Sequence, residues 1–186
     1  MNPLLQQAAT LALHCRDAEI RERVLLALES LEQVPQHLER WQASLVQNQT
    51  LAACLQIDLE PIARSQQLAT RLCDDGEFLL ALPLAMYCVT YASDNPEHSF
   101  LAGTCLQRLG QPASAVHFYR VVLQLDEADA ASAYRLAECL EAVGQPEEAS
   151  HLYHWTIELA RGNFALRSLQ DMANARLAKL VATRQP

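Results

Sequence analysis

Histidine and cysteine side chains offer most of the chemistry in this sequence, since imidazoles and thiolates ligate metals and act as bases or nucleophiles. The chain has six of each, and no two cysteines have C-x-x-C spacing. The intervals fit neither a zinc clip nor a compact disulfide framework, so we interpret the thiols as small buried apolar groups. His151 and His154, with Glu147 and Glu148 one turn before them, could imitate a metal pair.

The acidic pairs and the glycines do not indicate an enzyme. Asp74 and Asp75 stand at a turn beside a glycine, as Glu147 and Glu148 do, and the helix dipole favours acids at such places. The five glycines are too dispersed for a phosphate-binding loop. A hidden catalytic site would need a convergent polar cluster that the pattern does not contain, so we expect no enzyme activity.

The composition of the chain restricts which molecules it can bind and in which cellular compartment it is expected. The chain has 186 residues, 51% of them hydrophobic, which allows a sizeable core. Its formal net charge is -8, so we expect no nucleic-acid partner, because phosphate binding needs clustered Lys and Arg. No apolar run approaches the roughly 18 residues of a membrane span, and no export signal opens the chain. We therefore expect a cytoplasmic protein without stable membrane insertion.

A 34-residue period organises the chain. Gly76, Gly110 and Gly144 follow one another at this interval, which is that of the tetratricopeptide repeat, a helix–turn–helix unit. Glycine suits the left-handed turn that ends a first helix, and proline suits the start of the second. His117 and His151 share a repeat position, which indicates a scaffold surface rather than a metal site. We expect no metal and no cofactor.

We predict an all-α fold in which three tandem tetratricopeptide repeats form a curved α-solenoid. The repeats span 62–95, 96–129 and 130–163, with helices at 62–74 and 77–91, 96–108 and 112–125, and 130–142 and 146–161. No repeat buries its apolar face alone, so the three stack, with Tyr119 and Tyr153 filling the space between them. Pro83 lies inside a predicted helix and is expected to kink it.

The flanks of the repeats are also predicted to be helical. Residues 1–61 form an N-terminal extension in which Asp17 caps a helix, Pro35 opens a further stretch with Leu38, Trp41 and Leu45 on one side, and Thr50 caps a short helix through Leu55. The apolar faces of this extension need a partner, either the first repeat or a second copy of the chain. Residues 164–186 form a capping helix and tail, with Leu166, Leu169, Met172, Ala173, Leu177 and Leu180 on one face. The tail is basic, which fits a solvated end cap or a contact for an acidic partner.

Several motifs resemble those of one family. These are Gly103-x-Cys105 followed by Gln107 and Gly110, the tetrad Ala137-Glu138-Cys139-Leu140, the stretch 50–62 and the terminal stretch 164–181. They resemble the class II chaperones of bacterial type III secretion, which keep two hydrophobic translocators soluble before export. The resemblance covers about residues 50–182 and implies a chaperone that holds an extended translocator segment. Residues 1–48 are longer than the usual lead-in of the family. Two roles are open for this arm within the extension 1–61: it could dimerise, as the N-terminal helices of the family do, or occupy the protein's own groove.

The first helix of each repeat lines the concave side of such a solenoid, where repeat positions 5, 9 and 12 face inward. These positions hold Gln66, Thr70 and Cys73 in the first repeat, Phe100, Thr104 and Gln107 in the second, and Tyr134, Glu138 and Glu141 in the third. We predict that all of them except Glu141 line a peptide-binding groove. The resemblance adds Phe78 to this groove. Aromatic rings and amides together suit an extended peptide. The family commonly has tyrosines at the first three positions, so the pocket here is expected to be less aromatic.

Other roles remain open for several of these residues. Phe100 and Tyr134 could stack between repeats, Gln107 could be solvated, and Cys73 could be a packed thiol. Glu138 could instead pair with Arg108 or Arg135 and stiffen the scaffold.

The function expected from these patterns is that of a cytosolic chaperone for secreted hydrophobic translocators, which binds an extended client segment and forms a homodimer through its N-terminal helices. The alternative is a repeat adaptor in a needle-subunit or regulatory complex of the same secretion system.

Overall fold

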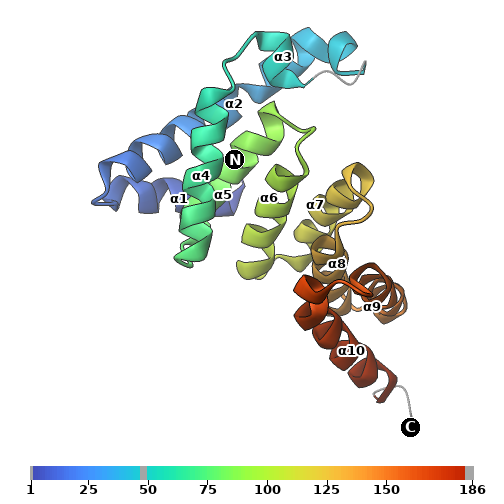
Figure 1. Ribbon diagram of the computed structural model, residues 1–186. Helices are drawn as coiled ribbons and strands as arrows, with labels where there is room; N and C mark the ends of the chain where they lie inside the picture. The colour runs from blue at the N-terminus through green and yellow to red at the C-terminus, as the bar shows by residue number, and fades with distance from the viewer. Residues whose placement is uncertain (1, 47–49, 183–186) are drawn as a thin grey trace. The chain divides into compact units, whose positions relative to one another are not determined.

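Every regular element in the parts of the chain that the computed structural model describes, residues 2–46 and 50–182, is a helix (Figure 1). In chain order the elements are α1 (Pro3–His14), α2 (Ala18–Val46), α3 (Leu51–Leu55), α4 (Glu60–Asp74), α5 (Phe78–Tyr91), α6 (Pro96–Arg108), α7 (Pro112–Leu125), α8 (Ala130–Ala142), α9 (Pro146–Ala160), the 3-10 turn η1 (Phe164–Leu166) and α10 (Arg167–Ala182). The predicted all-α class is confirmed. The chain divides into two compact units, Met1–Leu109 and Gly110–Pro186, which are described separately.

The hairpin turns have the geometry that the repeated glycines predict. Gly76 and Gly144 have φ values of 81° and 78°, in the left-handed region that side chains with a Cβ disfavour. In each turn the residue after the glycine donates its N–H to a carbonyl in the last turn of the first helix, Glu77 to Leu72 at 2.7 Å and Gln145 to Leu140 at 2.9 Å. The second helix then starts two residues after the glycine.

Substituting Gly144 with alanine is expected to lower the free energy of unfolding by about 1 kcal/mol. An added Cβ meets no atom within 4 Å, so the cost comes from the left-handed backbone alone. Gly144→Asn is the matched control, because asparagine tolerates this conformation better, and it should lose less stability. Urea unfolding of the three proteins tests this, and an alanine variant as stable as the parent would contradict it.

Helix α5 forms the centre of the Met1–Leu109 unit. It packs against α4 and α6 of the repeats and against α1, α2 and α3 of the N-terminal extension. Its buried residues are Leu80, Ala81, Leu82, Pro83, Leu84, Ala85, Cys88 and Tyr91, which cover all sides of the helix. The Tyr91 hydroxyl donates a hydrogen bond to the Ser30 carbonyl of α2 at 3.0 Å. The apolar faces of α1 and α2 therefore find their partner on the first repeat, and α5 continues through Pro83.

The helix α2 corrects one prediction. Asp17 caps it as expected, with its carboxylate accepting from the N–H of Glu19 at 2.9 Å, but Pro35 lies inside the helix instead of opening a new one. Val34, just before this proline, packs against the buried cluster around Leu51 and Ile62, and this contact favours continuation of the helix. The side chains of Leu38, Trp41 and Leu45 lie outside the described residues.

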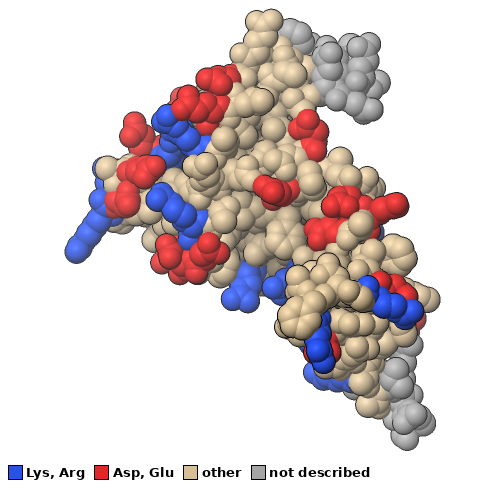
Figure 2. Space-filling model, in the orientation of Figure 1, with Lys and Arg blue, Asp and Glu red and all other residues tan. Residues whose placement is uncertain are grey.

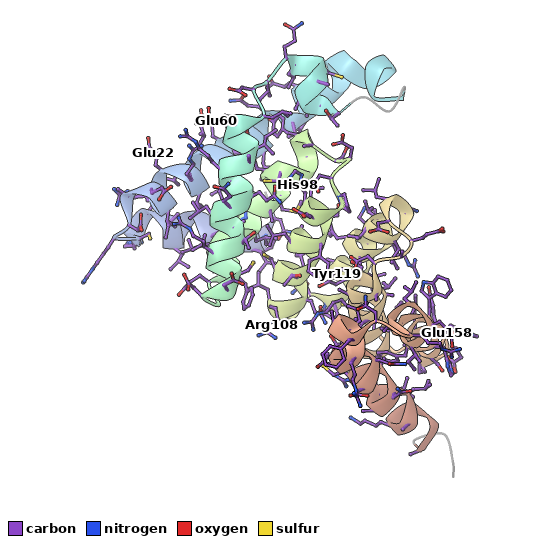
Figure 3. All side chains as sticks on the ribbon, in the orientation of Figure 1. Glu22, Glu60, His98, Arg108, Tyr119 and Glu158 are labelled. Carbon is purple, nitrogen blue, oxygen red and sulfur yellow. The ribbon has the colours of Figure 1, made fainter. Side chains whose placement is uncertain are left out.

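In the Gly110–Pro186 unit, α7, α8, α9 and α10 pack in sequence order. Tyr119 of α7 and Tyr153 of α9 are completely buried, as expected of residues that fill the interior, and Figure 3 labels Tyr119. Helix α10 occupies the predicted capping position and buries Ala173 and Leu180. Met172 is exposed, contrary to prediction, because the face centred on Ala173 leaves it at the edge.

Candidate peptide-binding site

The first unit brings seven of the predicted groove residues to helices α4 and α6 and to the start of α5. The two helices pack side by side, and all seven side chains are partly or fully exposed: Gln66, Thr70, Cys73, Phe78, Phe100, Thr104 and Gln107. We call this set the α4–α6 face. On the side of the molecule shown in Figure 2, acidic and basic side chains intersperse along α2 and α4, whereas the surface over α6 is mostly uncharged. Such a surface favours uncharged partners over strongly charged ones.

Gln66 is held by residues of α6 that the sequence analysis did not single out. Its amide nitrogen donates to Glu97 at 2.5 Å, and its amide oxygen lies 3.1 Å from Nε2 of His98. His98 is buried, and its Nδ1 lies 2.8 Å from the Ala92 carbonyl oxygen. Figure 3 labels this histidine near the start of α6. Since an amide has two N–H donors and two lone pairs, Gln66 keeps one donor for a peptide backbone while its orientation is fixed.

The two threonines of the face turn their hydroxyls to their own helices. Thr70 donates to the Gln66 carbonyl at 3.0 Å, and Thr104 donates to the Phe100 carbonyl at 2.9 Å. A hydroxyl bonded in this way leaves the methyl group as the part that contacts a ligand. The threonines therefore add apolar area to the face.

Phe78 lies at the edge of the face, where the Arg108 guanidinium stands 5.2 Å from the centre of its ring. This cation–π distance is favourable and orients the arginine over the aromatic ring. The contact pairs Arg108 with Phe78 at the edge of the face.

Cys73 contacts a second thiol. Its sulfur lies 3.4 Å from that of Cys105 on α6. The hydrogen bond with Cys105 lowers the pKa of Cys73 below the ordinary thiol value, against the opposing effects of burial and of Asp74. The same bond, together with burial, raises the pKa of Cys105 far above that value. Cys105 is a packed thiol, as the sequence predicts, whereas Cys73 is partly exposed.

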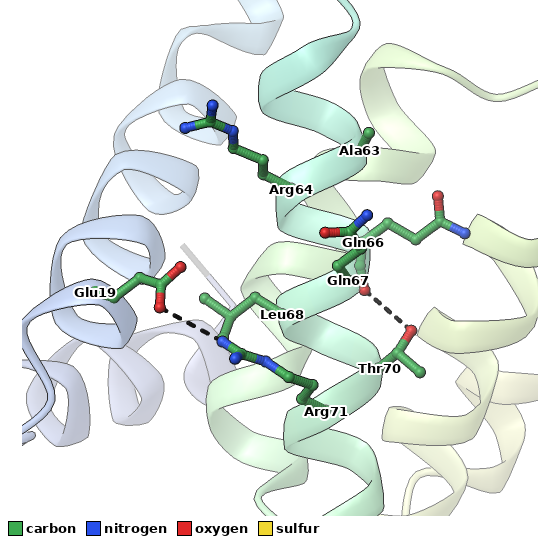
Figure 4. Close-up of a pocket in the computed structure, with 8 residues that line it drawn as sticks. All are labelled: Glu19, Ala63, Arg64, Gln66, Gln67, Leu68, Thr70 and Arg71. Atoms are coloured by element: carbon green, nitrogen blue, oxygen red, sulfur yellow. Dashed lines mark hydrogen bonds and ion pairs between the residues drawn. The ribbon is translucent and has the colours of Figure 1, made fainter.

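Two open pockets flank Gln66. One, of about 480 Å³, lies between α3, α4 and the α5–α6 turn, and its apolar lining includes Ile57, Leu59 and Ile62. The other, of about 540 Å³, lies beside α4 and α2, where Glu19 and Arg71 form an ion pair at 3.5 Å (Figure 4). The first pocket can accept an apolar side chain because of its apolar lining, whereas the second is lined mainly by charged and polar side chains.

The second unit uses the predicted groove residues of α8 differently. Tyr134 is only 5% exposed, and its ring centre lies 5.6 Å from that of Tyr153 in the same hairpin, so it packs within its own repeat. The carboxylate of Glu138, 14% exposed, pairs with Arg135 at 2.8 Å and with Arg176 of α10 at 3.2 Å. Both residues therefore join α8 to its neighbours, and for Glu138 the capping helix supplies a cation that the repeat pattern does not reveal. Contact of these two residues with a bound peptide stays a prediction.

A double-mutant cycle on Glu138 and Arg176 is expected to give a coupling free energy of about 1 kcal/mol, because the carboxylate is largely shielded from water. The variants are Glu138→Gln, Arg176→Gln and the double variant, compared by urea unfolding. The exposed pair of Glu158 and Arg161, 2.5 Å apart, is the matched control and should couple by close to zero. Equal coupling in the two cycles would show that Arg176 does not help to hold α10.

No helix in the described ranges is both long enough and apolar enough to span a membrane. The fold itself resembles known helical-repeat proteins. Residues 69–156 match the family model of anaphase-promoting complex (cyclosome) subunit 3. A sequence search of curated proteins gave no match.

Solved structures give a more extensive match. A type III secretion complex from Aeromonas hydrophila is 21% identical, with a TM-score of 0.72 over 78% of this chain and 97% of the other. SycD, the translocator chaperone of Yersinia enterocolitica, in complex with a peptide of the translocator YopD, is 19% identical, with a TM-score of 0.66 over 69% and 98%; SycD is also described as an alternative dimer. PcrH of Pseudomonas aeruginosa, with the chaperone-binding region of PopD, is 19% identical, with a TM-score of 0.65 over 69% and 96%. The chain thus has the fold of the type III secretion translocator chaperones.

Proposed function

We propose that this protein is a cytosolic chaperone that binds hydrophobic type III secretion translocators and keeps them soluble. The observation that carries the proposal is the α4–α6 face, where partly exposed aromatic rings and amides lie side by side in a fold shared with SycD and PcrH. Both of those proteins have been solved with a translocator segment bound.

The proposed mechanism is masking of one extended client segment. Phe78, Phe100 and the threonine methyl groups contact apolar side chains of the segment, while the amides of Gln66 and Gln107 bind its backbone. The apolar pocket beside Gln66 accepts one anchoring side chain. A covered segment cannot associate with other copies or enter a membrane, and release requires only that an export machine pull the segment away. Neither step needs a cofactor or a chemical reaction.

A homodimer through the N-terminal helices is part of the proposal. Leu11 and Leu13 of α1 and Leu26 of α2 are exposed although they are large and apolar. SycD is described as a dimer, which supports self-association, and the exposed leucines are the reason for placing the contact on α1 and α2.

Co-expression with the hydrophobic translocators of the same secretion system tests the function. The expected result is that a translocator, insoluble alone, becomes soluble and co-purifies with this protein. Pull-down from the native bacterium separates the alternative, since an adaptor would capture mainly a regulator or a needle subunit. A translocator that stays aggregated despite abundant chaperone would refute the proposal.

A further inference from the structure

Cys73 of the α4–α6 face is paired with the buried thiol of Cys105, and the masking mechanism gives this pair no role. Cys73 and Cys105 belong to different helices, and their sulfurs are 3.4 Å apart. A disulfide bond brings two sulfurs to about 2 Å, so closing it needs a small approach of the side chains. Cys73 is partly exposed and Cys105 is fully buried, so a reagent from solution reaches Cys73 first.

Two other buried thiols, Cys88 and Cys139, differ from Cys73 in the direction of their pKa shift. Burial raises the pKa of Cys88 and of Cys139 to about 12. Cys139 has the same repeat position as Cys105, but the residue one repeat after Cys73 is Gln107, which cannot supply a second sulfur. The pair at Cys73 and Cys105 is therefore a local feature of the first two hairpins and not a property of the repeat.

We propose that Cys73 and Cys105 are a modification site for peroxides, at which hydrogen peroxide or an organic hydroperoxide closes a reversible disulfide that ties α4 to α6. The effect of this bond on client binding rests on the function proposed above, whereas formation of the bond does not.

The reaction has two steps that balance. The Cys73 thiolate attacks the terminal oxygen of the peroxide and breaks the O–O bond, which gives a sulfenic acid on Cys73; hydroxide leaves when the oxidant is hydrogen peroxide, and an alkoxide leaves when it is an organic hydroperoxide. The Cys105 sulfur then attacks the Cys73 sulfur, forms the S–S bond and loses its proton, while the sulfenic oxygen leaves as water. The two thiols are oxidised by two electrons and the peroxide is reduced. A dithiol such as dithiothreitol reverses the change by thiol–disulfide exchange.

The contact between the Cys73 and Cys105 thiols favours the first step of the reaction, the attack of Cys73 on the peroxide. The hydrogen bond from the Cys105 thiol stabilises the thiolate form of Cys73, and thiolates are the nucleophiles in such reactions. The same contact, together with burial, raises the pKa of Cys105, which favours its thiol form. The bond would close a loop that contains the whole of α5, so it is expected to stabilise the unit against unfolding. It would also remove the Cys73 thiol from the face and restrict the spacing of α4 and α6, which is expected to lower client affinity severalfold.

The test treats the full chain with hydrogen peroxide at low protein concentration and measures the mass of the intact protein. The expected result is the loss of two hydrogen atoms, two fewer thiols open to alkylation in denaturant, a Cys73–Cys105 peptide in a non-reduced digest and a higher melting temperature, all reversed by dithiothreitol. Cys73→Ser and Cys105→Ser should not show the mass loss. Cys139→Ser is the matched control and should behave like the parent.

Three outcomes would overturn the proposal: accumulation of sulfinic acid without a cross-link, a disulfide between other cysteines, or a disulfide only between chains. Binding of the translocator found by co-expression is then compared for the reduced and oxidised protein. Equal affinity would overturn the effect on the client but leave the disulfide in place. Absence of binding by the reduced protein would count against the proposed function alone.

Discussion

Replacing Tyr153 with alanine is expected to lower the free energy of unfolding of the Gly110–Pro186 unit by about 3–5 kcal/mol. The Tyr153 side chain is completely buried on α9, and its ring packs beside that of Tyr134. Its hydroxyl donates a hydrogen bond to Glu141 at 2.9 Å. The alanine variant would leave a cavity between α8 and α9 and remove this donor. Since whole domains are stable by only about 5–15 kcal/mol, a loss of this size is a large part of the total.

Two variants separate the causes of that loss. Tyr153→Phe keeps the ring and removes the hydroxyl, and is expected to cost about 1 kcal/mol. His154→Ala changes the exposed neighbour on the same helix and should alter stability by less than about 0.5 kcal/mol. Urea unfolding followed by circular dichroism measures all three. A Tyr153→Ala protein as stable as the parent would show that the tyrosine does not fill the interior as the structure indicates.

Replacing Phe100 with alanine is expected to weaken translocator binding roughly thirtyfold, which corresponds to about 2 kcal/mol. Phe100 is the aromatic residue of α6 on the α4–α6 face, and it is partly exposed in the unliganded protein. Burying an aromatic ring against a peptide removes a large apolar area from water, and such residues carry most of the binding energy at interfaces. Calorimetric titration of the purified variant with the translocator found by co-expression measures the effect.

The controls for Phe100 must separate binding from folding. His117→Ala removes an exposed ring from α7, a second helix of a hairpin, and should leave binding unchanged. Gln107→Ala on the same face as Phe100 should cause a smaller loss, because an amide in a wet interface contributes less than an aromatic ring. Circular dichroism and the melting temperature show whether each variant is folded. A folded Phe100→Ala protein that binds as tightly as the parent would place the client elsewhere.

The hairpins could be predicted from the sequence because their signals are local. A glycine with φ near 80° and a proline at the next helix start have the same meaning wherever they occur, and the helices of the repeats start and end within two residues of the predicted positions. The caps at Asp17 and Thr50 are equally local, since each side chain accepts from N–H groups two or three residues ahead.

The details of the site could not be predicted because they depend on contacts between residues far apart in the chain. Arg176 reaches Glu138 across 38 residues, and His98 reaches Gln66 across 32. The burial of Tyr134 has the same cause, because Tyr134 on α8 is buried whereas Phe100, at the same repeat position on α6, is partly exposed. The prediction that Pro35 opens a new helix is wrong because the packing of Val34 against the buried cluster favours continuation of α2 through the proline.

The position of α5 decides how self-association of this protein should be studied. Because α1 and α2 pack against α5, a protein that starts near residue 50 would expose the apolar side chains of α5 that these two helices cover. Such a fragment would aggregate through its own interior, and a change in its mass would say nothing about the native assembly. Serine substitutions at Leu13 and Leu26, which leave the interior intact, are the informative choice for light scattering.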